Sequence, residues 1–235
     1  IQVDGYVLSP YHQVRPTEKV ILVVITSNKG LCGAFNSNII KEATSRLEFH
    51  KKKGCPSVRM ITIGKRATEM FRKQEGLVME SHDELLDNAD FDSIYSLAEQ
   101  IMQRFCNKEF DHVELIYNEF KNSIQQVLRT VQFLPIVSKD SKNEPHAPVN
   151  DYIFEPNKEE VLQALIPQTL CTQFYSTILD SLAAEHGARM TAMQKATDNA
   201  TELLAELRLS YNKARQAAIT NEIIEIVSGS EALKS

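Results

Sequence analysis

The sequence predicts an α/β domain with a mostly parallel sheet and helices on both of its faces, followed by one long C-terminal helix. Two observations predict the domain. Short apolar, β-branched segments alternate with segments of helical periodicity, and turn residues separate them. The helix is predicted because residues 158–228 contain one glycine, Gly187, and one proline, Pro167, among many helix formers.

The alternation starts with an apolar, β-branched run over residues 20–27, which is typical of a strand covered on both faces of a parallel sheet. Turn residues occupy positions 28–33. Apolar residues at helical spacing then predict a helix over residues 36–53, which ends at Gly54. The remaining elements are predicted as a strand over 58–63, helices over 65–73 and 91–106, a strand over 112–117 and an edge strand over 125–136.

Residues 138–150 are polar and contain two prolines, which is the composition of an exposed linker. We therefore expect a globular base domain over residues 1–150, with an opening segment over 1–17. The second part, residues 151–235, holds the long helix.

The long helix is predicted to carry a narrow apolar seam. Pro167 is expected to break or kink its first turns, and the remaining residues, about 60, would extend roughly 90 Å. A seam that covers an arc of about 80° is typical of a coiled coil. Because the sequence begins at Ile1 without a methionine, we expect the partner helix upstream of this sequence. The seam residues are Cys171, Tyr175, Ile178, Leu182, Met193, Ala196, Ala200, Leu203, Leu207, Tyr211, Ala214 and Ala218.

Beyond Ala218 the apolar residues spread over half of the helix circumference or more, which exceeds a two-helix seam. This breadth predicts that the tip sits in an apolar sleeve formed by other chains. The residues concerned are Ala217, Ile219, Ile223, Ile224, Ile226 and Val227.

Composition argues against several classes of protein. A net charge of −5 and a pI near 5.7 argue against a nucleic-acid binder. The sequence has neither an apolar run of about 20 residues nor a leader peptide, so we expect no direct insertion into a membrane.

Catalytic and metal-ligating patterns are also missing from the sequence. The four cysteines stand far apart and are expected to be reduced, mostly buried thiols. The six histidines are scattered, so we expect no metal site, no cofactor and no catalytic residue.

Residues 27–33, SNKGLCG, join the first predicted strand to the first predicted helix, where backbone amides can bind a phosphate. The segment has neither the Walker spacing nor a dinucleotide fingerprint. A structural turn is favoured, and a ligand site is the alternative.

Arg189 projects into the apolar arc of the long helix, where a cation is costly unless something pairs with it. Its side chain either reaches the edge of the seam or has a specific partner. Arg208 and Arg215 lie two turns apart on one face, which is either solvated or meets an acidic partner.

Three segments resemble the gamma subunits of F-type ATP synthases. Two lie in the predicted long helix, and the third is the first strand-to-helix turn. They are residues 185–201, EHGARMTAMQKATDNAT, residues 211–229, YNKARQAAITNEIIEIVSG, and residues 27–36, SNKGLCGAFN.

The resemblance implies a Rossmann-like base domain and an antiparallel coiled coil inside a ring of three alpha and three beta subunits. It implies that beta subunits contact Arg189, Arg215, Gln216, Thr220 and Glu222, with Arg215 and Gln216 forming a polar catch. Ile219, Ile223, Ile226 and Val227 would form an apolar bearing at the tip. A foot that meets the c-ring and the epsilon subunit would include Tyr152, Phe154 and Glu155.

The implied function is that of the central rotary shaft, which couples proton-driven rotation of the c-ring to ATP synthesis in the beta subunits. A bacterial origin is favoured because the regulatory cysteine pair of the chloroplast form is not seen. The expected location is the cytoplasmic face of the bacterial inner membrane, as a peripheral protein. The alternatives are a nucleotide-binding α/β enzyme and a coiled-coil adaptor unrelated to rotation.

Overall fold

The computed structural model describes residues 9–136, 155 and 157–232. The chain forms two compact units, Ile1–Met190 and Thr191–Ser235. The domain boundary predicted at residue 150 falls among residues outside the described part of the chain.

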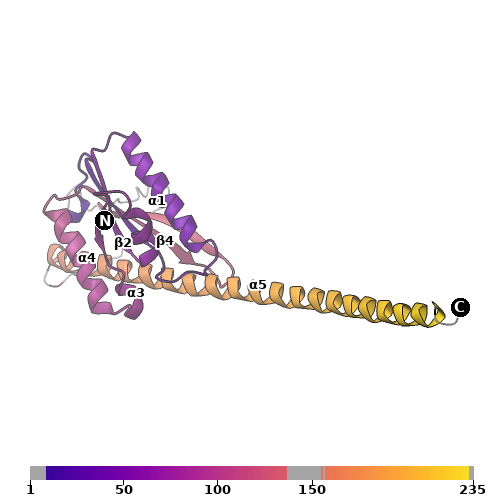
Figure 1. Ribbon diagram of the computed structural model, residues 1–235. Coiled ribbons are helices and arrows are strands. Elements are labelled where there is room, and N and C mark those ends of the chain that lie inside the picture. Colours follow the sequence, from indigo (N-terminus) through magenta and orange to yellow (C-terminus); the bar gives the residue numbers. More distant parts are fainter. Residues whose placement is uncertain (1–8, 137–154, 156, 233–235) are drawn as a thin grey trace, which may run out of the picture. The chain divides into compact units, whose positions relative to one another are not determined.

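Within the described residues of the first unit, five strands form one sheet in the order β3-β2-β1-β4-β5 (Figure 1). Strands β1, β2, β3 and β4 pair in parallel, and β5 pairs antiparallel with β4 at the edge. This confirms the predicted fold class. The strands are β1 (Lys19–Ile25), β2 (Ser57–Ile63), β3 (Val78–Ser81), β4 (His112–Phe120) and β5 (Gln126–Leu134).

The helices follow the predicted alternation, apart from two short ones, the 3-10 helix and α3. They are a 3-10 helix (Pro10–His12), α1 (Phe35–Lys52), α2 (Lys65–Phe71), α3 (Leu85–Asn88), α4 (Phe91–Cys106) and α5 (Lys158–Ala232). The 3-10 helix, strand β3 and helix α3 were not predicted. They have three or four residues each, none of them fully buried, so none of the three produces a recognisable apolar period.

Helices cover both faces of the sheet, which explains why six consecutive residues of β1 are buried. Ile21, Val23 and Ile25 belong to one buried cluster, which also contains α4 and the first half of α5. The alternate residues of β1 face a second cluster, formed with α1 and α2. The successive side chains of a strand point to opposite faces, so one apolar run serves two cores.

The first half of α5 packs on the sheet. Phe174 is fully buried, and its ring centroid lies 5.6 Å from that of Phe133 on β5. The coiled-coil prediction was therefore wrong for four seam residues, since all four pack into this core. A coiled-coil seam and a face that packs on a sheet share the same helical period, so the pattern does not distinguish them. The four are Cys171, Tyr175, Ile178 and Leu182.

The sequence predicted a break or a kink at Pro167. Helix α5 continues through this residue, so a break was wrong. A proline inside a helix removes one backbone hydrogen bond, and its ring crowds the preceding turn. Ile166 and Leu170, on either side of it, pack against the core of the sheet. Their burial offsets the local cost and keeps the helix continuous.

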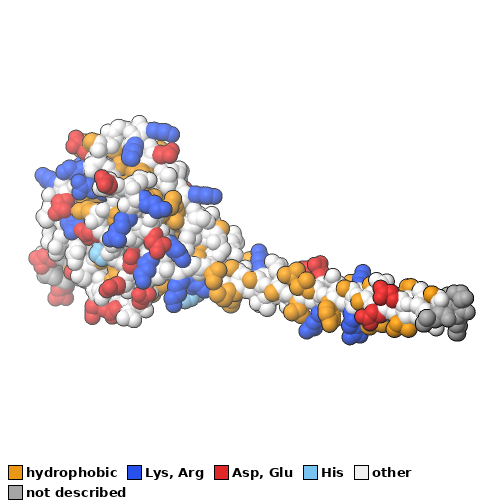
Figure 2. Space-filling model, in the orientation of Figure 1, with side chains coloured by type: hydrophobic (Ala, Val, Ile, Leu, Met, Phe, Trp, Pro, Cys, Tyr) orange, Lys and Arg blue, Asp and Glu red, His pale blue; other side chains and the backbone are white. Residues whose placement is uncertain are grey.

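In the second unit, α5 leaves apolar side chains exposed. All side chains described from Met193 to Ser230 are exposed. Figure 2 shows hydrophobic side chains at intervals along this part of the helix, with charged groups between them. No helix among the described residues is long and apolar enough to cross a membrane.

Candidate functional site: the turn after the first strand and the long helix

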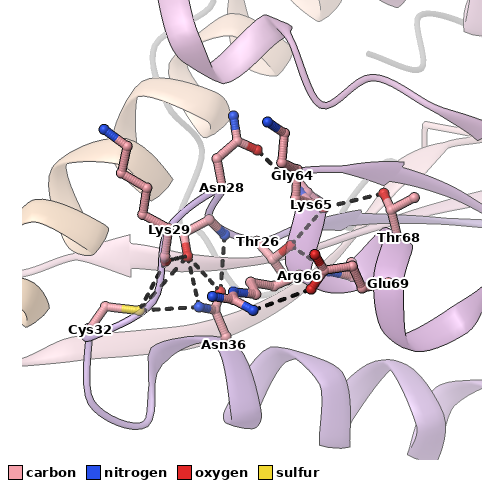
Figure 3. Close-up of polar contacts among 12 residues, drawn as sticks. Thr26, Asn28, Lys29, Cys32, Asn36, Gly64, Lys65, Arg66, Thr68 and Glu69 are labelled. Carbon is pink, nitrogen blue, oxygen red and sulfur yellow. Dashed lines mark hydrogen bonds and ion pairs between the residues drawn. The ribbon is translucent and has the colours of Figure 1, made fainter.

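The turn after β1 is held by side chains of the turn and of α1. The amide of Ser27 donates to Oδ1 of Asn36 at 3.0 Å, and Nδ2 of Asn36 donates to Oγ of Ser27 at 2.7 Å. The side-chain Nδ2 of Asn36 also donates to Sγ of Cys32 at 3.1 Å (Figure 3). Gly33 takes a positive φ of 61°, which a glycine adopts without strain. Asn36 thus fixes the first strand-to-helix turn from within α1.

A second turn, at Gly64, passes very close to the end of β1. A Cβ at this position would lie 2.2 Å from the carbonyl oxygen of Thr26, and φ is +105°. The hydroxyl of Thr26 donates to the carbonyl of Gly64 at 3.2 Å. Only glycine allows this approach, which brings the ends of β1 and β2 together.

The backbone amides at the start of α2 are already hydrogen-bonded. The amide of Lys65 donates to Oδ1 of Asn28 at 3.0 Å, that of Arg66 to the carbonyl of Ser27 at 3.3 Å, and that of Ala67 to Oγ1 of Thr26 at 3.0 Å (Figure 3). A phosphate at this helix end would have to displace these bonds. Residues 26–28 therefore have a structural role as acceptors at the start of α2.

Arg189 of α5 contacts this same turn. Its guanidinium pairs with Glu185 one helical turn earlier, with Nη2 and Oε1 2.6 Å apart. The same group donates to the carbonyls of Gly30, at 3.3 Å, and Lys29, at 3.4 Å. The side chains of Arg189 and Glu185 are only 17% and 10% exposed. Arg189, which the sequence places on the apolar arc of the long helix, therefore has a specific partner. The contact also joins two of the segments that resemble gamma subunits, residues 27–36 and 185–201.

The other predicted contacts of the beta subunits lie in the second unit, on α5. Arg215, Gln216, Thr220 and Glu222 are all exposed. Thr220 donates from its hydroxyl to the carbonyl of Gln216 at 2.8 Å. Neither Arg215 nor Glu222 has an ion-pair partner among the described residues. Their predicted contacts remain predictions.

The predicted bearing residues are exposed as well. The exposed fractions are 46% for Ile219, 56% for Ile223, 72% for Ile226 and 52% for Val227. Isolated exposed apolar residues are ordinary, but a contiguous group of them marks an interaction surface. For the predicted foot, Glu155 is exposed, and Tyr152 and Phe154 lie outside the described residues.

The fold also assembles a cluster that spacing along the chain did not predict. His50 at the end of α1 and His112 and Glu114 on β4 place their ligand atoms within 4.8 Å of one another. Burial by itself would raise the pKa of Glu114. A hydrogen bond from His112 and the charges of His50, His112 and Arg46 outweigh it and lower that pKa.

Three partners of the site were missed by sequence reasoning, and each had a weak signal. Glu185 stands four residues before Arg189, the spacing of a helical ion pair. Asn28 and Asn36 are residue types that cap nearby amides. No sequence motif predicted the cluster of His50, His112 and Glu114. The one hint was the two-residue spacing of His112 and Glu114 on β4.

Comparisons with known proteins match nearly the whole chain. The family model described as ATP synthase matches residues 3–233. The ATP synthase gamma chain of Flavobacterium johnsoniae is 51% identical over 98% of this chain and 78% of its own length. That of Geobacter metallireducens is 40% identical over 96% and 77% of the two chains.

Solved structures share the architecture. A chain in the central stalk and c-ring structure of the Tetrahymena thermophila mitochondrial ATP synthase is similar with a TM-score of 0.58 and 25% identity, over 79% of each chain. A chain in the Euglena gracilis mitochondrial enzyme, solved with OSCP, F1 and the c-ring, has a TM-score of 0.63 at 21% identity. It covers 92% of this chain and 73% of that chain, and at this identity the likeness shows the fold alone.

Proposed function

This chain belongs to the ATP synthase gamma chain family, and on that premise we propose that it acts as the shaft that couples c-ring rotation to conformational change in the beta subunits. It is a subunit of the complex, and the chemistry of ATP synthesis takes place on its partners. We propose that it has no catalytic site of its own. The capped amides at the start of α2 support this, since they leave no ready phosphate site at that helix end.

One observation carries the proposal: α5 leaves a long row of apolar side chains exposed from Met193 onward. Exposed apolar surface of this extent favours burial against partner chains. The proposed partners are three alpha and three beta subunits around the helix, with the epsilon subunit and the c-ring at the foot. The proposed location is the cytoplasmic face of a bacterial inner membrane, where the chain would be held peripherally by its complex.

The mechanism works through differential contacts. This part of α5 exposes apolar residues together with Arg215 and Gln216, and so offers a different surface to each surrounding subunit. A partner with an open and a closed state shifts toward the state that binds the facing surface better. Rotation would then move each beta subunit through its states in turn.

The test measures ATP-driven proton pumping and ATP hydrolysis by the assembled enzyme in membrane vesicles. We expect Arg215→Ala and Gln216→Ala to lower the protons pumped per ATP, or the yield of the complex, because each removes a polar contact. Arg72→Ala is the control, since Arg72 is also exposed but lies in the first unit. Unchanged coupling and yield in both helix variants would contradict the assigned catch.

The two alternatives predict other outcomes. An enzyme that uses the turn as a phosphate loop would bind ATP as an isolated chain. A coiled-coil adaptor would self-associate and would not be retained by alpha and beta subunits. Either result would overturn the rotary proposal.

A further inference from the structure

A buried group of three metal-ligating side chains lies at the opposite end of β1 from the turn that contacts Arg189. His112 and Glu114 stand two residues apart on β4 and therefore point to the same face of the sheet. They pair with Val20 and Leu22 of β1, whose side chains belong to the cluster packed under α1. His50, in the last turn of α1, closes the group from above.

The separations within this group match those of a metal site. Nε2 of His50 lies 3.1 Å from Oε1 of Glu114, and Nε2 of His112 lies 3.0 Å from the same oxygen. Ligand atoms about 2.0 Å from a tetrahedral zinc ion are roughly 3.3 Å apart. All three ligand atoms lie within 4.8 Å of one another. A small rotation of one imidazole would therefore bring the set around one ion.

The group also has unused ligand capacity. Among the described residues, neither Oε2 of Glu114 nor Nδ1 of His50 has a hydrogen-bond partner, although both atoms are buried. Glu114 is 7% exposed as a residue. A buried polar atom without a partner is costly, and such atoms in native proteins call for an explanation.

Arg46 also forms an ion pair with Glu114, with Nε 4.0 Å from Oε2. The same Nε lies 3.1 Å from Glu42, so its charge is shared with a second carboxylate. His112 is the most exposed of the three ligands, with 15% of its side chain accessible. It provides the route by which an ion and a fourth ligand, such as water, would enter.

We propose that His50, His112 and Glu114 form a binding site for a divalent transition-metal ion, with Zn²⁺ as the ion that two imidazoles and one carboxylate suit best. The ion would join the last turn of α1 to the start of β4 and thereby stabilise the base of the chain. The proposal is independent of the rotary function, because it lies within the first unit and concerns its stability.

The experiment titrates the full chain, stripped of metals with EDTA, with ZnCl₂ in a calorimeter. We expect one ion per chain, with micromolar or tighter affinity, and a higher Tm in the presence of zinc. His112→Asn should weaken binding by about 100-fold or more and abolish the rise in Tm, because it removes one of three ligands. Its partial exposure makes this the variant least harmful to folding.

His82→Asn is the matched control. His82 also faces a carboxylate, with Nε2 3.3 Å from Oε2 of Glu80, but it belongs to no group of three ligands among the described residues. This variant should bind zinc like the parent chain. Should His112→Asn fail to fold, Glu114→Gln serves instead, with Co²⁺ as a probe whose visible spectrum reports its ligands.

Two results would overturn the proposal. One is the absence of stoichiometric zinc binding by the parent chain. The other is equal affinity in the parent chain and in a folded variant that lacks one ligand. In either case the three residues form a hydrogen-bonded network without a metal.

Discussion

Arg189 is the residue at which two segments far apart in the sequence meet. Its guanidinium pairs with Glu185 and donates to the carbonyls of Lys29 and Gly30. Because both charged side chains are largely buried, removing one leaves the other without compensation. The contact therefore has a structural role within the chain. The resemblance assigns Arg189 a contact with beta subunits, and that assignment stays a prediction.

A double-mutant cycle tests the structural role. We expect Arg189→Met to lower the free energy of unfolding of the isolated chain by about 2 kcal/mol, with a coupling to Glu185→Gln of about 1–2 kcal/mol. The exposed pair Arg66–Glu69, also on one helix, is the control and should couple by about 0.5 kcal/mol or less. The free energies come from urea unfolding of the four variants of each pair. Equal coupling in the two pairs would show that burial of Arg189 adds nothing.

At the scale of the element, α5 is one helix with two kinds of surface. Up to Ala188 it contributes buried residues to both cores of the sheet, and from Met193 onward its described side chains are exposed. The apolar period continues through both parts. The apolar residues of the first part are buried against the sheet of the same chain. Those of the second part stay exposed and are available to bind partner chains.

Two truncations on this helix separate the parts. Phe174→Ala should destabilise the isolated chain by about 3–5 kcal/mol, because it removes a fully buried ring beside Phe133. Leu203→Ala should change the stability of the isolated chain by about 0.5 kcal/mol or less, because Leu203 is 56% exposed. Thermal and urea unfolding give both values. A large loss in the Leu203 variant would mean that this half of the helix is packed within the chain.

At the scale of the whole molecule, stability and partner binding are divided between the two compact units. Every buried residue among those described lies before Thr191. The second unit consists of exposed helix, so its removal takes little from the cores. The first unit thus holds the buried residues that stabilise the fold, and the second unit holds the proposed contacts with the alpha and beta subunits.

Removal of residues 191–235 from the full-length subunit tests this division. We expect the shortened chain to keep its cooperative unfolding, with a Tm within a few degrees of the parent, because no described buried residue is lost. We also expect it to lose co-purification with alpha and beta subunits and to leave no coupled ATP hydrolysis. A stable, coupled complex without this segment would remove the shaft role from α5.

The sequence by itself determined the α/β alternation, the mostly parallel sheet with an edge strand at β5, and the existence of the long helix. These features follow from local periodicity, which does not depend on what the chain folds against. The signature segments at residues 27–36, 185–201 and 211–229 also identified the family, which the comparisons confirm. The contacts of Arg215, Gln216, Thr220 and Glu222 with beta subunits remain predictions, because they need partner chains.

Only the tertiary structure decided which surface each residue meets. The pattern from Cys171 to Leu182 fits a helix partner and a sheet equally well, and the sheet is what lies there. Helix α5 passes Pro167 because packing on both sides holds it. His50 meets His112 and Glu114 across more than sixty residues of chain because α1 crosses β4, and no spacing along the sequence encodes that crossing. Periodicity is local, whereas packing partners and convergent side chains depend on the arrangement of the whole fold.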